Sequence, residues 1–274
     1  MDTKTFPLAG AINLQARVGH GSLTVDARDG LTEATVTVEP RSKFIPGDHD
    51  PIESTVVDMR GSTLVVMTPR QGGIFDVGLL GRHSGRQEAI DITVTVPSGT
   101  AVKASAFTAD ITVTGRTGSA EIAAGSSTIA VEHVDGDLRL RYGSGTAQVQ
   151  RVSGTVEARS GSGDARFGEI GGALTAACSS GNLEVAVVRG SVRARAGSGT
   201  ASLAAVYGDV DLASGSGRLA IGLPAGRSAR LDVTTGSGRV NSELPVEDAP
   251  APNGTPIAVR ARTGSGDIHL FRAA

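Results

Sequence analysis

Apolar and polar residues alternate in short runs along most of this chain, and the runs recur at a fixed interval. Between residues 118 and 222 a Gly-Ser-Gly or similar corner returns every 18 positions, as from Gly143 to Gly161, and a second glycine marks the middle of each repeat. After the mid-repeat glycine, the inward candidates hold the second, fourth and sixth positions, as in Leu138, Leu140 and Tyr142. This alternation has the period of a β-strand with one buried face.

The half-repeat that follows each corner has a different pattern. Its apolar residues hold the second, fourth and seventh positions, as in Leu183, Val185 and Val188. The additional residue indicates a bend or bulge, so both a flattened two-sided roll and a three-sided prism fit the pattern. Helix is excluded, because glycine returns about every nine residues and no apolar stripe has the helical period.

A short fixed repeat predicts a solenoid, in which each coil buries its apolar face against the next. The predicted fold is all-β: a single-stranded parallel β-solenoid (β-helix or β-roll) whose coils each take up 18 positions, right-handed by the usual preference of parallel crossovers. Regular coils are expected over 99–274. Residues 1–98 are expected to form a less regular β N-terminal part, as coils or a cap, and the whole chain one continuous elongated domain.

Three segments do not fit strands and are predicted to be loops. They are Pro40–Pro51, Pro69–Gln87 and a Pro-rich stretch at 243–256. The first contains Asp48-His49-Asp50, but neighbouring loop residues rarely converge on a metal ion without further ligands, so no metal site is predicted there. The second carries apolar residues and is a candidate contact site or cap.

Composition favours a thin core, since aromatic residues make up only 3% of the chain and tryptophan is missing. The net charge of −2 gives no electrostatic reason to expect nucleic acid or an anionic membrane as a partner. The N-terminus lacks the pattern of a signal peptide and no run is long enough for a membrane span, so a cytoplasmic location is expected. The single cysteine, Cys178, occupies an inward position and is expected to be a buried structural thiol.

Catalytic and metal-binding patterns are not found. The five histidines are scattered without ligand spacing, and the glycine-rich corners lack the lysine of a phosphate-binding loop. Aspartate follows a repeat glycine only at some coils, so calcium-binding nonapeptide repeats are not expected; these residues are Asp137, Asp164, Asp209 and Asp267. The chain is therefore predicted to be no enzyme and to need neither cofactor nor metal.

The outward positions carry an ordered pattern of charge. The third position after each mid-repeat glycine alternates in sign except at one threonine: Lys103, Glu121, Arg139, Glu157, Thr175, Arg193, Asp211. Neighbouring strands lie about 4.8 Å apart, so these side chains can pair between coils or remain ordinary solvated charges. The fifth position adds three arginines. The predicted interaction surface for an acidic partner comprises Arg139, Arg141, Arg159, Arg193 and Arg195.

The ends of a solenoid expose unpaired backbone groups. Only three residues follow Phe271, too few to cover a final strand. The strand containing Ile268, Leu270 and Phe271 is therefore the candidate assembly edge, through which a tail-to-tail dimer or a filament would form.

The Gly-Ser-Gly strand repeats, the alternating N-terminal strands and the final Thr263-Gly264-Ser265-Gly266-Asp267-Ile268 resemble the bacterial putative-adhesin family of β-strand-repeat proteins, a domain of unknown function. The resemblance covers nearly the whole chain. It implies a single β-solenoid without established activity. A weaker resemblance is to bactofilins, cytoskeletal solenoids that polymerise end to end.

The pattern leaves three classes of function to consider: a scaffold, a carbohydrate-binding or adhesin-like β-helix, and an enzyme. The sequence favours a non-catalytic structural or interaction scaffold, with a protein partner or self-association through the solenoid ends. Carbohydrate binding is the alternative, although recurrent acid pairs and aromatic platforms are missing from the outward positions.

Overall fold

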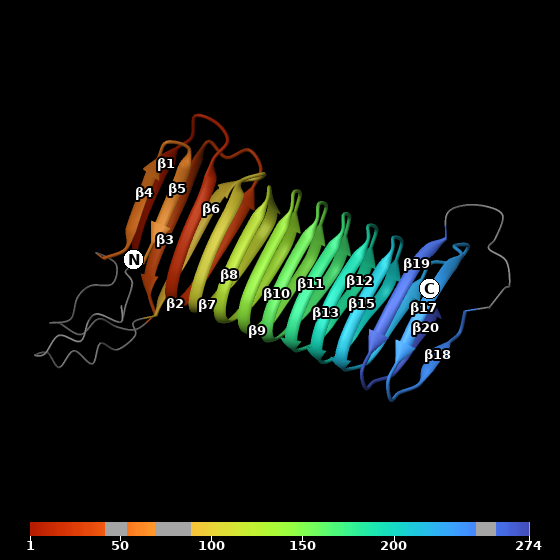
Figure 1. The fold of residues 1–274 in the computed structure, drawn as a ribbon. Coiled ribbons are helices and arrows are strands. Elements are labelled where there is room, and N and C mark those ends of the chain that lie inside the picture. The colour runs from red at the N-terminus through yellow and green to blue at the C-terminus, as the bar shows by residue number, and fades with distance from the viewer. Residues whose placement is uncertain (42–53, 69–88, 245–255, 274) are drawn as a thin grey trace, which may run out of the picture. The chain divides into compact units, whose positions relative to one another are not determined.

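The computed structural model describes residues 1–41, 54–68, 89–244 and 256–273. Within these ranges the chain forms twenty β-strands and no helix, which confirms the all-β prediction (Figure 1). The strands belong to two compact units, Met1–Glu132 and His133–Ala274. The three predicted loops, with Asp48, His49 and Asp50, lie wholly or mostly outside the described residues, and the prediction of one continuous domain stays a prediction.

The first unit combines parallel and antiparallel pairs. Its strands are β1 (Asp2–Pro7), β2 (Asn13–Arg28), β3 (Glu33–Pro40), β4 (Val56–Arg60), β5 (Thr63–Met67), β6 (Ile90–Pro97), β7 (Ala101–Thr117) and most of β8 (Ala120–Val134). β2 pairs in parallel with β5, β6 and β7, whereas β1–β3, β3–β6 and β4–β5 are antiparallel. The alternating inward residues, such as Leu14, Leu23 and Ile92, are buried. β2 continues as one strand through Gly19-His20-Gly21.

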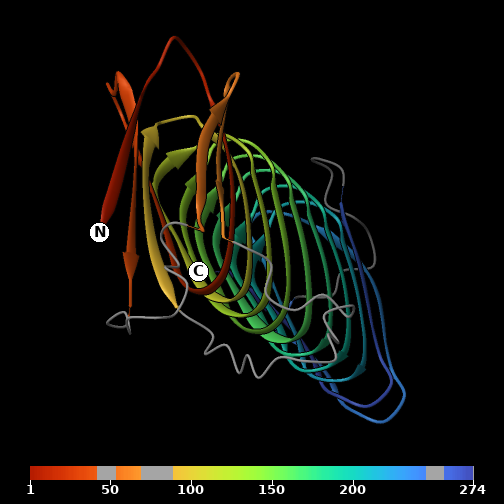
Figure 2. The same ribbon diagram turned by 90° about the vertical axis from the view of Figure 1, so that its left-hand side faces the viewer.

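The second unit repeats a single parallel pairing. Its strands up to residue 223 are β9 (Leu138–Val152), β10 (Val156–Ile170), β11 (Leu174–Ser180), β12 (Leu183–Val188), β13 (Val192–Ser198), β14 (Ala201–Val206), β15 (Val210–Ser216) and β16 (Leu219–Leu223). Each paired residue lies 18 positions from its partner, as in Leu138↔Val156, Val156↔Leu174 and Leu174↔Val192. Figure 2 shows the chain of this unit returning in successive turns.

Burial confirms the predicted inward positions of the second unit. Leu138, Leu140 and Tyr142 are buried in β9, and Leu183 and Val188 are buried in β12. The sixth position is less shielded in β10, β11 and β13, at Ser160, Cys178 and Ala196. Cys178 is accordingly half-buried rather than buried.

Close stacking explains why glycine recurs at the corners and mid-repeats. Gly199 has a φ of 120°, a value that side chains disfavour. A Cβ added to Gly199 would also lie 2.1 Å from the carbonyl oxygen of Gly181 on the neighbouring strand. At the mid-repeat, a Cβ on Gly208 would lie 2.5 Å from the carbonyl carbon and oxygen of Gly190. These glycines therefore allow neighbouring backbones to approach closely. Close approach is a second reason, in addition to the turn itself, why glycine recurs at these positions.

The last four strands do not follow each other in space. They are β17 (Ala229–Thr235), β18 (Val240–Ser242), β19 (Ile257–Thr263) and β20 (Ile268–Arg272). β19 lies between β15 and β17, and β20 lies between β16 and β18. The two final strands in the sequence, β19 and β20, are thus inserted between the regular repeat and the two strands that precede them in sequence.

This strand order corrects the expected assembly edge. Ile268 pairs with Leu219 on one side and Val240 on the other, and Leu270 likewise pairs with Ile221 and Ser242. Phe271 pairs with Gly222. β20 is therefore an interior strand. The prediction of an edge was wrong because it assumed that the order of strands along the chain equals their order in space. At the C-terminal end of this unit, the outermost described strands are β17 and β18.

Candidate interaction surface

The register of the second unit places the predicted arginines side by side. Arg139 on β9 lies opposite Glu157 on β10, and Arg141 lies opposite Arg159. These residues alternate with the buried Leu140 and Ala158, so their side chains point away from the core. The strands that fold to bury the alternating apolar positions therefore also gather the charged positions on one face.

Three arginines surround Glu157. The carboxylate of Glu157 lies 3.0 Å from Nη2 of Arg159, 3.7 Å from Nε of Arg139 and 3.8 Å from Nη2 of Arg141. One carboxylate cannot neutralise three guanidinium groups, so this cluster keeps an excess of positive charge.

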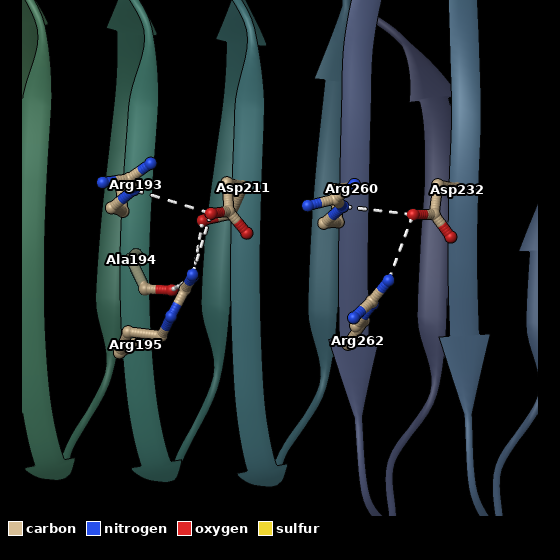
Figure 3. A network of polar contacts seen from close by, with 7 residues as sticks. All are labelled: Arg193, Ala194, Arg195, Asp211, Asp232, Arg260 and Arg262. Carbon is tan, nitrogen blue, oxygen red and sulfur yellow. Dashed lines mark hydrogen bonds and ion pairs between the residues drawn. The ribbon is translucent and has the colours of Figure 1, made fainter.

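A second network lies farther along the same face (Figure 3). Asp211 on β15 accepts a hydrogen bond of 2.8 Å from Nη2 of Arg195 and lies 3.5 Å from Nε of Arg193, both on β13. Nη1 of Arg195 also donates to the backbone oxygens of Ala194 and Asp211. Each guanidinium is thus held against a neighbouring strand, which orders its position.

Asp232 and β19 extend the network to the outermost strand. Asp232 on β17 lies 3.1 Å from Nε of Arg260 and 3.2 Å from Nη2 of Arg262, both on β19 (Figure 3). The third-position column therefore continues Arg193, Asp211, Arg260, Asp232 across paired strands. Charges of opposite sign stay adjacent because β19 is inserted between β15 and β17.

The two networks together form what we call the arginine face. Seven arginines share the carboxylates of Glu157, Asp211 and Asp232: Arg139, Arg141, Arg159, Arg193, Arg195, Arg260 and Arg262. Their side chains are between 49% and 71% exposed. The fifth-position column contributes four of the arginines and no acid. The face is consequently positive although the whole chain has a net charge of −2.

The carboxylates of the second network are held in their ionised form. A hydrogen bond from Arg195, together with the nearby charges of Arg195 and Arg193, lowers the pKa of Asp211. A hydrogen bond from Arg260, with Arg262 nearby, lowers the pKa of Asp232. Because both pKa values fall below the ordinary range of aspartate, the network stays ion-paired at neutral pH.

An open groove of about 960 Å³ crosses the strands that carry this network. It runs over β11, β13, β15, β19 and β17, and its lining includes Thr175, Arg193, Asp211, Arg260 and Leu231. The groove therefore gives an elongated ligand access to several strands at once.

The structure brings the five predicted residues into the two clusters, and it adds two that the sequence reasoning missed. Arg260 and Arg262 lie 28 and 30 residues from their partner Asp232, so the regular repeat does not reach them. The sequence contains a pattern that could have identified these two arginines. The pattern Arg-x-Arg occurs at Arg139, at Arg193 and again at Arg260.

The recurring aspartates serve the backbone. Asp137, Asp164, Asp209 and Asp267 each accept a backbone N–H from the neighbouring strand, at 2.8 to 2.9 Å. Asn182 continues the pattern by accepting the N–H of Thr200 at 3.0 Å. These side chains satisfy donors where strands begin, which explains why aspartate or asparagine follows a repeat glycine.

Tyr142 and Cys178 line a small cavity in the core. Its volume is about 20 Å³, and alanines are the commonest residues in its wall; the space suits about one water molecule. Burial raises the pKa of Tyr142 to about 12 and raises the pKa of the Cys178 thiol. The Tyr142 hydroxyl donates to the backbone oxygen of Asp164 at 2.8 Å. Both groups stay protonated at neutral pH, so neither is an activated nucleophile.

In the part of the chain that the structure describes, no three His, Cys, Asp or Glu side chains are grouped to hold a metal ion. Nor does any helix there have the length and apolar character needed to cross a membrane.

The fold defines an all-β protein built from mostly parallel strands with a repeated register. A family model for Toastrack DUF4097 matches residues 52–273, and the chain belongs to this family, whose function is unknown. The resemblance to bactofilins stays a prediction. A search of curated proteins gave no match.

Several solved structures are similar to this chain. One is described as a "putative adhesin" from Bacteroides fragilis (13% identity, TM-score 0.38, covering 98% of this chain and 96% of that one). Another is a "putative lipid binding protein" from Parabacteroides distasonis (14% identity, TM-score 0.40, 98% and 96%). A third is a "putative cell adhesion protein" from Clostridium sporogenes (12% identity, TM-score 0.22, 99% of each chain).

Proposed function

We propose that this protein is a non-catalytic interaction scaffold: a right-handed parallel β-solenoid with coils of 18 residues in its regular part, whose arginine face binds an acidic protein partner. The observation that carries the proposal is the sharing of three carboxylates by seven exposed arginines on one face. A repeated register of 18 positions between paired strands supports the expected coil length. A cytoplasmic location is part of the same proposal.

Arginine suits such a surface because its planar guanidinium binds carboxylates through two parallel hydrogen bonds. Arg141, Arg159, Arg195 and Arg262 project from one column of the sheet, on strands of fixed spacing. Their backbones are held in the sheet before a partner arrives. Binding of a partner therefore costs the entropy of ordering the arginine side chains, but it does not require ordering of this chain's backbone.

The absence of catalysis is a proposal supported by the state of the two acids in the groove. A hydrolase acting on a sugar chain needs one carboxyl group with a raised pKa to act as general acid. Asp211 and Asp232 are each held by two arginines, and their pKa values are lowered. This arrangement suits binding better than proton donation.

An acidic carbohydrate is the second candidate ligand. The open groove of about 960 Å³ crosses five strands, which favours an extended polymer. Aromatic platforms for neutral sugars are missing from the groove lining. A carbohydrate bound here would therefore be recognised mainly through its acidic groups.

Binding to two acidic polymers tests the proposal. Poly-L-glutamate represents an acidic protein and alginate an acidic carbohydrate, and binding is measured at low and at physiological salt. In the double variant Arg141→Glu and Arg159→Glu, we expect the affinity for poly-L-glutamate to fall at least about 10-fold. The affinity of the wild type should weaken as salt is added.

The matched control is the double variant Arg151→Glu and Arg166→Glu, which reverses the charge at both positions. These two arginines lie on the same two strands but pair with Glu169 and Glu184 outside the arginine face. This variant has the same change in net charge. The proposal fails if the two double variants bind poly-L-glutamate alike, or if the wild type binds it at neither salt concentration. Preference for alginate over poly-L-glutamate would favour the second candidate.

A further inference from the structure

β17 leaves one edge of the second unit open. Among the described residues it pairs only with β19, so its other side presents unpaired backbone groups. Its core positions are also uncovered: Leu231 is 38% exposed, whereas Val259, its partner on β19, is 1% exposed. On β18, Val240 is 48% exposed. The terminal strands thus carry apolar residues that every inner strand buries.

Among the described residues, β17 itself lacks several of the features by which natural sheets prevent pairing. Proteins commonly protect an edge strand with proline, lysine, a bulge or an inward-pointing charge. β17 spans seven residues, Ala229–Thr235, and contains neither proline nor lysine nor glycine. Its charged residues, Arg230 and Asp232, alternate with the core residues Leu231 and Val233, so neither charge points inward. The strand is suited to accept another strand.

We propose that the partner of this edge is the β17 strand of a second copy of this chain, paired antiparallel about a two-fold axis at Leu231. In this register Arg230 lies opposite Asp232 of the other copy, and Leu231 lies opposite its own equivalent. Directly opposite residues share one face of an antiparallel pair, so the two ion pairs form outside and the apolar residues meet inside. The interface is self-complementary, as a two-fold axis requires.

The side chains of the free edge are prepared for this pairing. Arg230 has neither an ion pair nor a side-chain hydrogen bond among the described residues. Asp232 uses Oδ2 for both Arg260 and Arg262, which leaves Oδ1 to accept from the second copy. A register centred on Asp232 would instead place like charges opposite each other, which is unfavourable. Charge therefore favours the register centred on Leu231 over the register centred on Asp232.

This inference deepens the scaffold proposal by giving it a second partner, a copy of itself, and it does not depend on binding by the arginine face. It is tested by measuring mass rather than ligand binding. Sedimentation equilibrium of the full chain should show a dimer. Arg230→Asp, which breaks neither an ion pair nor a side-chain hydrogen bond among the described residues, should weaken dimerisation at least about 10-fold.

Charge exchange tests the register itself. Asp232→Arg alone should likewise weaken dimerisation, because the new arginine faces Arg230 of the other copy. An equimolar mixture of Arg230→Asp and Asp232→Arg should form a heterodimer, since opposite charges again face each other at both pairs. The control Arg141→Asp has the same change in charge on β9 and should dimerise like the wild type.

Several outcomes would overturn the inference. A wild type that stays monomeric at all concentrations excludes the interface, and so does an Arg230→Asp variant that dimerises like the wild type. A mixture that remains monomeric excludes the register. Thermal unfolding of each variant shows whether Asp232→Arg is folded. If it is not, the comparison of Arg230→Asp with Arg141→Asp decides the question alone.

Discussion

Replacing Leu174 with aspartate is expected to unfold the second unit. Leu174 is 1% exposed and lies between Val156 and Val192 on the paired strands. Aspartate there would place an unpaired charge in an apolar column, or force its own protonation. Burial of the charge and protonation of the carboxylate each cost several kcal/mol. We expect the free energy of unfolding to fall by more than about 4 kcal/mol, which is a large part of the stability of an ordinary domain.

The neighbouring residue supplies the control. Thr175 lies on the same strand but is exposed, so Thr175→Asp adds the same charge on the outer side. Its free energy of unfolding should change by no more than about 0.5 kcal/mol. Denaturant unfolding followed by circular dichroism measures both variants. If Leu174→Asp unfolds at the same denaturant concentration as Thr175→Asp, the inward register is wrong.

Replacing Gly199 with alanine is expected to have the second largest effect. The φ of 120° strains any side chain, and the new Cβ would lie 2.1 Å from the carbonyl oxygen of Gly181. Backbone atoms cannot rotate away as a side chain can. The strain and the overpacking together should cost about 2–5 kcal/mol, measured as a lower Tm and a lower denaturant midpoint.

Gly10→Ala is the matched control, because a Cβ there meets nothing within 4 Å and the residue has no positive φ. We expect it to melt within a degree or so of the wild type. Equal melting of Gly10→Ala and Gly199→Ala would contradict the close approach at the corner.

The sequence predicted which residues of the repeats face inward, because alternation of apolar positions depends only on the pleat of a strand. It did not predict where strands stop. β9 and β10 continue through their Gly-Ser-Gly corners, whereas β11 ends at Ser180 and β12 begins at Leu183. Nor did alternation reveal the antiparallel pairs of the first unit, since it identifies the buried face of a strand and not its direction.

The candidate site was predicted in its regular part and missed in its final part for the same reason. A fixed period locates Arg139 and Arg193, but it does not apply once the chain leaves the repeat. Charge contained the missing information. Asp211 and Asp232 would repel each other if β17 followed β15, and Arg260 separates them because β19 lies between. Requiring opposite signs on adjacent strands would have predicted this order.

The insertion of β19 and β20 has a consequence for biosynthesis. β17 and β18 leave the ribosome first, yet their backbone partners are β19 and β20. Strands β10 to β16 can add one after another as they emerge, since each pairs with a strand already made. β17 must instead wait until Ile257–Thr263 has been synthesised, and β18 must wait until Ile268–Arg272 has been synthesised. Their apolar residues are exposed in the meantime. This end of the second unit therefore completes its folding last, after translation of β20.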